Sequence, residues 1–318
     1  MNLLEVKNLK MYYETLRGYV KAVDDVSFYV KRGEALGLAG ESGCGKTSAA
    51  LSIMRLLPSN AKIMGGSIFF NGEDTIKIQL KKFRGEFCWK KISVIFQGAM
   101  NCLFPIKKIG DQITEPMLIH ENIGKKEAWE RARRLLDLVG VGAERIDRYP
   151  HELSGGLKQR VMIAMSLACN PELVIADEPT TALDVIMQSQ ILNVIDELRE
   201  KLNLSMILIS HNLSVIADSC DTIAIMYAGK IVEYADVTSL FKKPLHPYSE
   251  KLINAFPSIV GERRVLSSIG GSPPDLLSPP PGCRFHPRCP YVTQECKEKE
   301  PELIEASSQH WVACHLVG

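Results

Sequence analysis

A glycine-rich octapeptide between an apolar run and a helical run constrains the fold more than any other feature of this sequence. Residues 40–47 read Gly-Glu-Ser-Gly-Cys-Gly-Lys-Thr, and residues 34–39 before them have the apolar character of a buried strand. Residues 48–57 after them form a helical run that ends before Pro58. A strand, a glycine-rich turn and a helix in this order predict a loop that wraps a chain of phosphates, and this context disfavours a chance match.

The chemistry of such a loop depends mainly on backbone groups. Its three glycines allow N–H groups to turn inward, and the dipole of the following helix adds a partial positive charge. Lys46 is expected to lie along the β- and γ-phosphates, and the Thr47 hydroxyl is expected to bind Mg²⁺. Nucleotide contacts are expected from Gly40, Ser42, Gly43, Cys44, Gly45, Lys46, Thr47 and Ser48.

Cys44 allows two interpretations. It lies beside a helix N-terminus and two residues from Lys46, which favours a lowered thiol pKa. A small side chain that fills space inside the loop is the simpler interpretation.

A second apolar run, residues 173–177, ends in two carboxylates. Asp177 is expected to hold the water shell of the magnesium ion, because that ion needs an acidic partner at the end of a second buried strand. Glu178 follows where an attacking water would lie, so we predict that it is the general base. Two such residues can also be a solvated strand end, but their order after the phosphate loop favours the functional interpretation.

Residues 153–159, Leu-Ser-Gly-Gly-Leu-Lys-Gln, open a predicted helix that runs to Ala168. A serine and two glycines before a helix make a second anion-binding N-terminus. The chain's own phosphate loop leaves this N-terminus no phosphate, so Ser154 and Gly156 are expected to cover the nucleotide of another subunit.

This motif, between a phosphate loop and an Asp-Glu strand, resembles the signature of ATP-binding-cassette (ABC) ATPases. The resemblance covers about three quarters of the chain. It implies an α/β phosphate-loop ATPase core in which two cassettes pack head to tail. Each ATP would then lie between one phosphate loop and the signature helix of the partner.

The same resemblance implies roles for four further residues. Gln97 would contact magnesium and water, Asp184 would cross the dimer interface, and His211 would touch the γ-phosphate. Taken alone, His211 would be interpreted as a histidine at a strand end. Tyr13 would stack on adenine, with the tyrosines at positions 12 and 19 as alternatives.

Hydrophobic patterning over residues 1–240 fits a nucleotide-binding domain. Alternation at 3–31 and 66–72 predicts a half-buried antiparallel sheet, with a turn at Asn71-Gly72. Short runs predict the strands of a mainly parallel core sheet at residues 92–96, 173–177, 205–210 and 222–227. A helical subdomain is expected over about 98–160, and its clearest helix is 125–139.

The loop at residues 98–116 is the predicted contact with a membrane-spanning partner. Met100, Leu103 and Phe104 are expected to be exposed there, and exposed apolar side chains mark interaction surfaces.

Residues 241–318 are expected to form a C-terminal extension. Nine prolines between residues 241 and 287 exclude a long helix or a central strand. The motif Leu-His-Pro-Tyr at 245–248 resembles the C-terminal extension of oligopeptide and dipeptide importer ATPases, and residues 19–28 resemble the same subgroup. That subgroup also includes importers of nickel, glutathione and sugars. Because every predicted nucleotide contact precedes residue 212, ATP binding is expected to survive replacement of a single cysteine in this extension by serine.

The last 36 residues contain four of the nine cysteines, Cys283, Cys289, Cys296 and Cys314. In a cytosolic protein such clustering argues for metal and against disulfides. The closely spaced pairs of a zinc site are absent, and wide loops with Pro290 after a cysteine favour a [4Fe–4S] cluster, as the subgroup resemblance also implies. Zinc and unliganded thiols remain alternatives. His286, His310 and His315 could support zinc, but they are more simply interpreted as surface residues.

Composition limits the class of protein. The 38 Lys+Arg and 37 Asp+Glu residues leave a net charge of +1, so no basic surface for nucleic acid is expected. The N-terminus lacks the pattern of a signal peptide, and no window approaches 18 uncharged apolar residues. We therefore expect a cytoplasmic protein that lies at the inner face of the membrane through its partners.

Together these motifs predict the ATP-hydrolysing subunit of a di- and oligopeptide importer. Its expected partners are a second ABC ATPase subunit, favoured as a paralogue, two transmembrane permease subunits and, indirectly, an external substrate-binding protein. A soluble ABC ATPase that acts on ribosomes or DNA is the alternative of another class, although a single cassette without heptads argues against it. The transported molecule is left open, because the specificity surfaces lie on other polypeptides.

Overall fold

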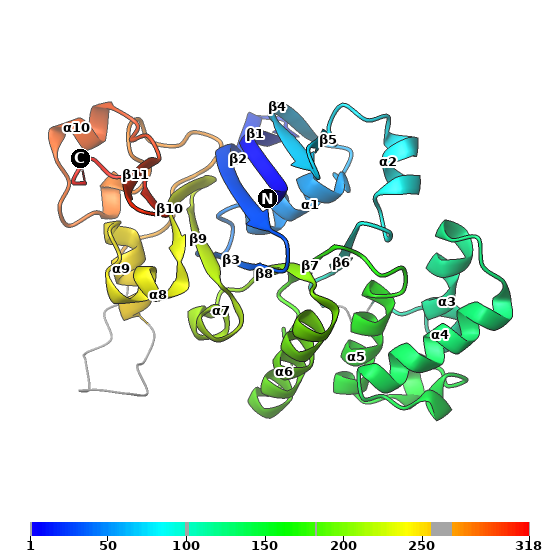
Figure 1. Cartoon of the computed structure of the whole chain (residues 1–318). Coiled ribbons are helices and arrows are strands. Elements are labelled where there is room, and N and C mark those ends of the chain that lie inside the picture. Colours follow the sequence, from blue (N-terminus) through cyan, green and yellow to red (C-terminus); the bar gives the residue numbers. More distant parts are fainter. Residues whose placement is uncertain (1, 99–101, 182, 256–268, 318) are drawn as a thin grey trace. The chain divides into compact units, whose positions relative to one another are not determined.

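The computed structural model describes residues 2–98, 102–181, 183–255 and 269–317, which form two compact units. The first unit holds residues 31–34 and 77–208, and the second holds residues 2–30, 35–76 and 209–317. Both units contain helices and strands, as Figure 1 shows.

The second unit begins with an antiparallel sheet. Its strands lie in the order β2 (Gly18–Lys31), β1 (Asn2–Thr15), β4 (Ala61–Phe70) and β5 (Glu73–Asp74). β1 pairs antiparallel with β4, from Leu4 opposite Phe70 to Tyr13 opposite Ala61. Side chains on one face, such as Leu4 and Phe70, are fully buried, because successive residues of a strand point to opposite faces. The predicted half-buried sheet is confirmed, as is the turn at Asn71-Gly72, where both residues have positive φ.

A second set of strands in this unit contains both parallel and antiparallel pairs. Their order is β11 (Ile304–Ser307), β12 (His310–Val312), β10 (Lys230–Asp236), β9 (Thr222–Tyr227) and β3 (Ala35–Ala39). β3 and β9 are parallel, whereas β9 and β10 form an antiparallel hairpin across Ala228-Gly229. β12 pairs with β10, so the last strands of the chain extend the sheet that contains β3.

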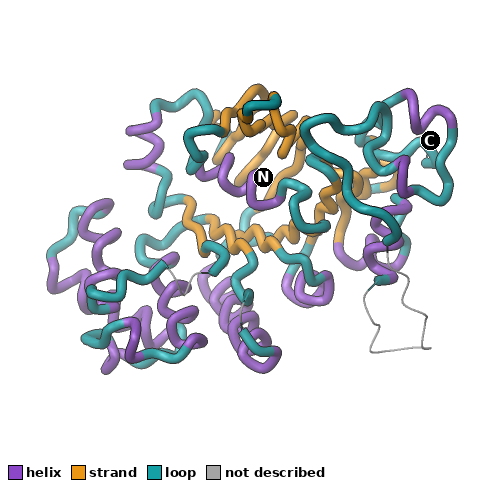
Figure 2. Tube along the Cα trace, turned by 180° about the vertical axis from the view of Figure 1, so that it is seen from behind, coloured by secondary structure: helices purple, strands orange, loops and turns teal. Residues whose placement is uncertain are grey.

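The C-terminal residues pack in the same hydrophobic cluster as these strands. Tyr248, Leu252 and Phe285 are buried there together with Ile223 and Tyr227. The helices of this unit are α1 (Lys46–Met54), α7 (Leu213–Ser219), α8 (Val237–Lys242), α9 (Pro247–Asn254) and α10 (Gln294–Glu298), with the 3-10 turn η4 (His286–Arg288). Figure 2 shows mostly loop around the C-terminus, as the prolines predict.

The first unit contains most of β8 (Ser205–Ile209), then β7 (Leu173–Asp177) and β6 (Ile92–Ile95), with β6 parallel to β7. Together with β3 and β9, they confirm the predicted core strands. Its helices are α2 (Leu80–Glu86), α3 (Ile109–His120), α4 (Lys125–Leu138), α5 (Gly155–Ser166) and α6 (Val185–Leu202), with the 3-10 turns η2 (Ala143–Arg145) and η3 (Pro150–Glu152). Within the described ranges, no helix is both long enough and apolar enough to span a membrane.

The helical part of this unit is built from α3, α4 and α5, which pack on one another. The helix expected at 125–139 is α4, and Ala128, Ala132 and Leu136 lie fully buried on one face of it, as in an amphipathic helix. The helix ends at Leu138, two residues before Gly140, whose positive φ of 71° suits a helix terminus.

The loop before α3 differs from the expectation that its apolar residues are exposed. Leu103 is only 5% exposed, so that expectation is wrong, whereas Phe104 is 60% exposed. Gln112 of α3 explains the difference, because its side chain accepts a bond from the Phe104 N–H (2.8 Å) and donates to the Phe104 carbonyl (3.1 Å). The loop therefore folds back on α3 and buries Leu103. Met100 lies outside the described residues.

Candidate functional site

The phosphate loop of the second unit joins β3 to α1, and each of its three glycines has a positive φ. A Cβ at Gly40 would lie 2.1 Å from the Met226 carbonyl oxygen, and one at Gly45 would lie 2.1 Å from the Ala22 carbonyl oxygen. Only glycine fits at these two positions. Around a Cβ at Gly43, by contrast, the described residues place no atom within 4 Å, so the middle of the loop is open to a ligand.

The Lys46 side chain lies inside the loop and bonds to its backbone. Its ammonium donates to the carbonyl oxygens of Gly40 (2.7 Å) and Glu41 (3.0 Å), and the residue is 6% exposed. Ser42 and Thr47 are exposed beside it, with Thr47 in the first turn of α1. These side chains therefore lie where an anion at the helix N-terminus would meet them.

Tyr13 reaches the same helix start. Its hydroxyl lies 3.1 Å from the hydroxyl of Ser48. The tyrosine before it, Tyr12, instead donates to the carboxylate of Asp24 at 2.6 Å. Of these two neighbours, Tyr13 is therefore the one that contacts the loop; its stacking on adenine stays a prediction.

The Cys44 thiol is buried inside the loop. Burial raises its pKa, and this effect exceeds the opposing influence of Lys46. The interpretation that the pKa is lowered is therefore wrong. Its Sγ would lie 2.8 Å from a Cβ at Gly40, so Cys44 acts as the small filler of the loop.

Two residues of the C-terminal extension also contact the loop, and sequence reasoning missed both. The Glu41 N–H donates to the hydroxyl of Tyr248 at 2.9 Å. Arg288 donates to both carboxylate oxygens of Glu41, at 2.7 and 2.9 Å. The Leu-His-Pro-Tyr motif was a signal for Tyr248, but no spacing in the sequence marks Arg288. The expectation that ATP binding survives replacement of a cysteine in the extension was made without these two contacts.

In the first unit, the residues predicted to act on water lie together at the end of β7. Asp177 ends the strand at 4% exposure, and Glu178 follows with a φ of 46°, which is unusual for a residue other than glycine. The Glu178 Oε2 accepts from the Gln97 Nε2 (3.0 Å) and from the Thr181 hydroxyl (2.9 Å). Thr181 was not predicted as a site residue, although it lies three residues after the glutamate.

The signature motif begins α5, with Ser154 exposed as its N-cap residue. A Cβ at Gly156 would lie 1.9 Å from the methyl group of Met187, so this glycine faces α6 and a larger residue there would displace the flexible Met187 side chain. Asp184 is exposed and caps α6 by accepting from the Met187 N–H at 2.9 Å. His211 follows β8 and is exposed in the second unit. The roles of these residues toward a nucleotide stay predictions.

The four C-terminal cysteines lie near enough to influence one another. Burial raises the pKa of Cys283 to about 11, the backbone N–H of Phe285 opposes the rise, and the other three thiols add to it. Tyr291 and Leu316 supply similar backbone contacts to Cys289 and Cys314. Among the residues that the structure describes, however, no group of three or more histidine, cysteine, aspartate or glutamate side chains could hold a metal ion.

His310 is not a surface residue, so that interpretation is wrong. It is 5% exposed on β12, and its Nε2 lies 2.7 Å from a carboxylate oxygen of fully buried Glu233. The same carboxylate accepts from the N–H groups of Leu245 and His246, at 2.7 and 3.0 Å. This network anchors the Leu-His-Pro-Tyr motif to β10.

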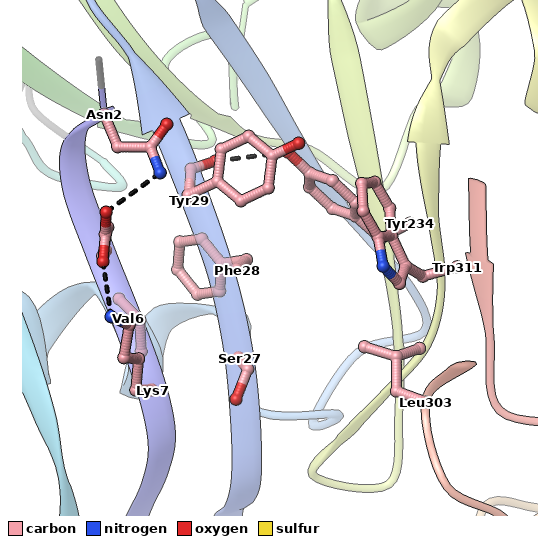
Figure 3. A pocket seen from close by; sticks show the side chains of 10 residues that line it. Asn2, Val6, Lys7, Ser27, Phe28, Tyr29, Tyr234, Leu303 and Trp311 are labelled. Atoms are coloured by element: carbon pink, nitrogen blue, oxygen red, sulfur yellow. Dashed lines mark hydrogen bonds and ion pairs between the residues drawn. The ribbon is translucent and has the colours of Figure 1, made fainter. Parts of the chain in front are cut away.

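A hollow beside the C-terminal strands is mainly apolar. Its volume is about 350 Å³, and Tyr29, Tyr234 and Trp311 line it with ring centroids 5.3–6.1 Å apart (Figure 3). Glu5 and Lys7 at its rim form a 2.7 Å ion pair with each other. None of the predicted site residues lines this hollow.

Family models match two parts of the chain. A model described as ABC transporter matches residues 23–181, and one described as Oligopeptide/dipeptide transporter, C-terminal region, matches residues 232–296.

Curated proteins resemble the chain over most of its length. It is 47% identical to the oligopeptide transport ATP-binding protein AppD of Bacillus subtilis (strain 168), over 99% of this chain and 96% of that protein. It is 45% identical to the oligopeptide transport ATP-binding protein OppD of Escherichia coli (strain K12), over 94% and 89%. The dipeptide transport ATP-binding protein DppD of the same strain is 41% identical, over 99% and 97%.

Solved structures share the fold. The dimeric post-hydrolysis structure of the ATP-binding cassette MJ0796 bound to ADP and Pi has a TM-score of 0.66 at 24% identity, over 74% of this chain and 98% of that one. CbiO1 from Clostridium perfringens has a TM-score of 0.65 at 26% identity, over 76% and 91%. These likenesses confirm the predicted α/β fold with its antiparallel sheet and helices.

Proposed function

Because this chain belongs to the ABC transporter family of ATPases, we propose that it is the ATP-hydrolysing subunit of an importer for dipeptides and oligopeptides. One observation carries the choice of substrate. The match to relatives named for peptide transport continues beyond the cassette into residues 232–296, the region that a peptide-transporter model describes.

ATP would bind along the phosphate loop. The open space at Gly43 would admit phosphates, and the α1 dipole would stabilise their charge. Lys46 would exchange its carbonyl contacts for phosphate oxygens. The hydroxyl of Thr47 and the carboxylate of Asp177 suit Mg²⁺, which prefers oxygen ligands. When bound, the ion would neutralise charge on the β- and γ-phosphates. The remaining predicted contacts, from Tyr13 and His211, belong to this proposal.

Hydrolysis would depend on Glu178. Two neutral donors, Gln97 and Thr181, bond to one carboxylate oxygen and orient the side chain. The strained backbone at Glu178 supports the same role, because positive φ at residues other than glycine often occurs at functional sites. Glu178 would then accept a proton from the water that attacks the γ-phosphate.

The working form would be a cassette dimer in which Ser154, Gly156 and Asp184 of one chain meet the nucleotide of the other. We favour a paralogous partner, two permease subunits at the inner face of the membrane and an external substrate-binding protein. Phe104, 60% exposed, and Ile106, 86% exposed, are candidates for contact with a permease subunit. Closure of the dimer on ATP would drive the permease, and hydrolysis would release it.

The C-terminal cysteines would hold a [4Fe–4S] cluster. Two observations support this assignment. The thiols raise one another's pKa, so they lie near one another. Backbone N–H groups two residues after Cys283, Cys289 and Cys314 bond to the sulfur atoms, as is suited to thiolates around a cluster. Zinc is the alternative, and a single zinc ion would bind all four thiols around one point. When bound, the cluster would cross-link a segment of low secondary-structure content.

Uptake in a strain that lacks the gene tests the function. Loss of labelled dipeptide and tripeptide uptake, restored by the intact gene but not by Lys46→Ala, is expected. Loss of nickel, glutathione or sugar uptake with normal peptide uptake would favour another importer of the subgroup. Co-purification with ribosomes or DNA in place of membrane subunits would favour the non-transport class.

A further inference from the structure

Glu41, the second residue of the phosphate loop, is bonded at each of its polar groups. Its carbonyl accepts from Lys46 inside the loop, at 3.0 Å. Its N–H and its carboxylate are bonded by the C-terminal extension, through Tyr248 (2.9 Å) and Arg288 (2.7 and 2.9 Å). The conformation at the start of the loop is therefore determined partly by residues more than 200 positions later in the chain.

The two residues of the extension are themselves held firmly. Tyr248 is fully buried, with its ring 4.6 Å from that of Tyr227 and 5.4 Å from that of Phe285. The Arg288 side chain is 4% exposed and also donates to the carbonyls of Gly270 (2.9 Å) and Ile269 (3.2 Å). Side chains locked in this way can position a neighbour without losing further conformational entropy.

The charge of Glu41 makes the pairing important for an anionic ligand. A free carboxylate in a loop that binds a triphosphate would repel it, since like charges at short range oppose binding. A guanidinium that bonds both oxygens of the carboxylate removes most of that repulsion.

We propose that Arg288 and Tyr248 are positioning residues of the ATP site, which act through Glu41 by neutralising its carboxylate and fixing its backbone. This inference rests on the proposed ATP-binding function. It also gives the C-terminal extension an effect on nucleotide affinity, because both positioning residues belong to the extension and bond Glu41 of the loop.

The test measures the Kd of Mg-ATP by calorimetry on the full-length chain in the hydrolysis-deficient Glu178→Gln background. Arg288→Gln should raise the Kd roughly tenfold, because it leaves the carboxylate unpaired. The Kd of the Glu41→Gln chain should stay within about twofold of the parent value. The double variant, Arg288→Gln with Glu41→Gln, should have a Kd close to that of Glu41→Gln alone. Tyr248→Phe, which removes only the hydroxyl, should raise the Kd about threefold.

The matched control is Glu300→Gln, which breaks an ion pair between the extension and Lys230 of β10. It should leave the Kd unchanged. In the hydrolysing chain, Arg288→Gln should raise KM for ATP while kcat at saturation stays within about twofold. The effect on Kd should also shrink as salt is added.

Two results would overturn the inference: an Arg288→Gln chain that binds ATP like the parent, or a double variant that binds as weakly as Arg288→Gln alone. If the Arg288→Gln chain does not fold, the Arg288→Lys chain takes its place in the test. The inference is then overturned if the Kd of Mg-ATP is unchanged in both Arg288→Lys and Tyr248→Phe. Failure of the parent chain to bind ATP would instead overturn the proposed function.

Discussion

The side-chain amide of Gln97 donates to the carboxylate of Glu178 across 3.0 Å, although 81 residues separate the two in the chain. The two lie together because β6 and β7 are parallel neighbours, so the loops after both strands begin at the same edge of the sheet. Any movement of the loop after β6 therefore changes the surroundings of the predicted base.

Replacing Glu178 with Gln should preserve ATP binding and slow turnover by about 10²–10⁴-fold, because the amide keeps the shape but accepts no proton. Single-turnover hydrolysis and calorimetry measure the two effects. Lys46→Ala should instead lose ATP binding, since the ammonium is the buried charge of the loop. Unchanged steady-state hydrolysis in Glu178→Gln would exclude Glu178 as the base.

Gln97→Ala and Thr181→Val should each lower kcat about tenfold while the Kd of ATP changes by less than about threefold. Each variant removes one of the two donors that orient the Glu178 carboxylate. The double variant should lose less than the product of the single effects, because the donors share one acceptor oxygen. If both single variants hydrolyse ATP at the parent rate, the two hydrogen bonds have no catalytic role.

The purified chain should be a weak ATPase and mainly monomeric without ATP, because Ser154 and Gly156 are expected to complete the site of a second chain. Sedimentation velocity with Glu178→Gln should show a dimer only when Mg-ATP is present. Specific activity should fall on dilution. Constant specific activity down to nanomolar concentration, with no dimer, would indicate a site that one chain completes alone.

Anaerobically purified protein should be brown and contain about four irons and four sulfides per chain. Serine at position 283, 289, 296 or 314 should bleach the colour, whereas Cys102→Ser, at an exposed cysteine outside the extension, should not. Arg288 directly precedes Cys289, so loss of the cluster should disturb its contact with Glu41. The bleached variants should therefore also bind ATP more weakly, whereas the positions of the nucleotide motifs alone predict unchanged binding. Colourless protein with one zinc per chain would exclude the iron–sulfur cluster.

His246 predicts a pH dependence of stability. Complete burial lowers its pKa from 6.5 to about 4, so between these values the unfolded chain binds a proton that the folded chain does not. Stability should therefore fall as pH falls through this range, by up to about 3 kcal/mol. His246→Asn keeps an acceptor for the Tyr248 N–H at the start of α9, but the asparagine does not titrate. The stability of this variant should therefore fall less than that of the parent as the pH falls.

Denaturant unfolding at pH 7.5 and pH 5 measures that difference. The exposed His151→Asn serves as the control and should follow the parent chain. Equal losses of unfolding free energy in the parent chain and in His246→Asn would show that His246 does not cause the pH dependence.

Much of the fold could be predicted from local patterns. The apolar runs became β3, β6, β7, β8 and β9, the alternating runs became β1, β2 and β4, and the α4 stripe packs inward as its period predicts. These predictions succeed because the period of the apolar side chains along a segment is a property of the local sequence and differs between a strand and a helix.

Features that depend on distant partners could not be predicted. Leu103 is buried because Gln112 draws its loop onto α3, and the Cys44 pKa rises because the finished core excludes water from the thiol. His310 is buried because β12 pairs with β10 and places it on Glu233.

The sequence by itself determined the nucleotide motifs, their order and the strands and helices that present them, since each is a short stretch with its own geometry. Only the tertiary structure decided that Arg288 lies on Glu41, 247 residues earlier in the chain. That pairing follows from the packing of Tyr248 and Phe285 into the core beside β9, and the spacing of residues along the chain contains no record of which segments pack together.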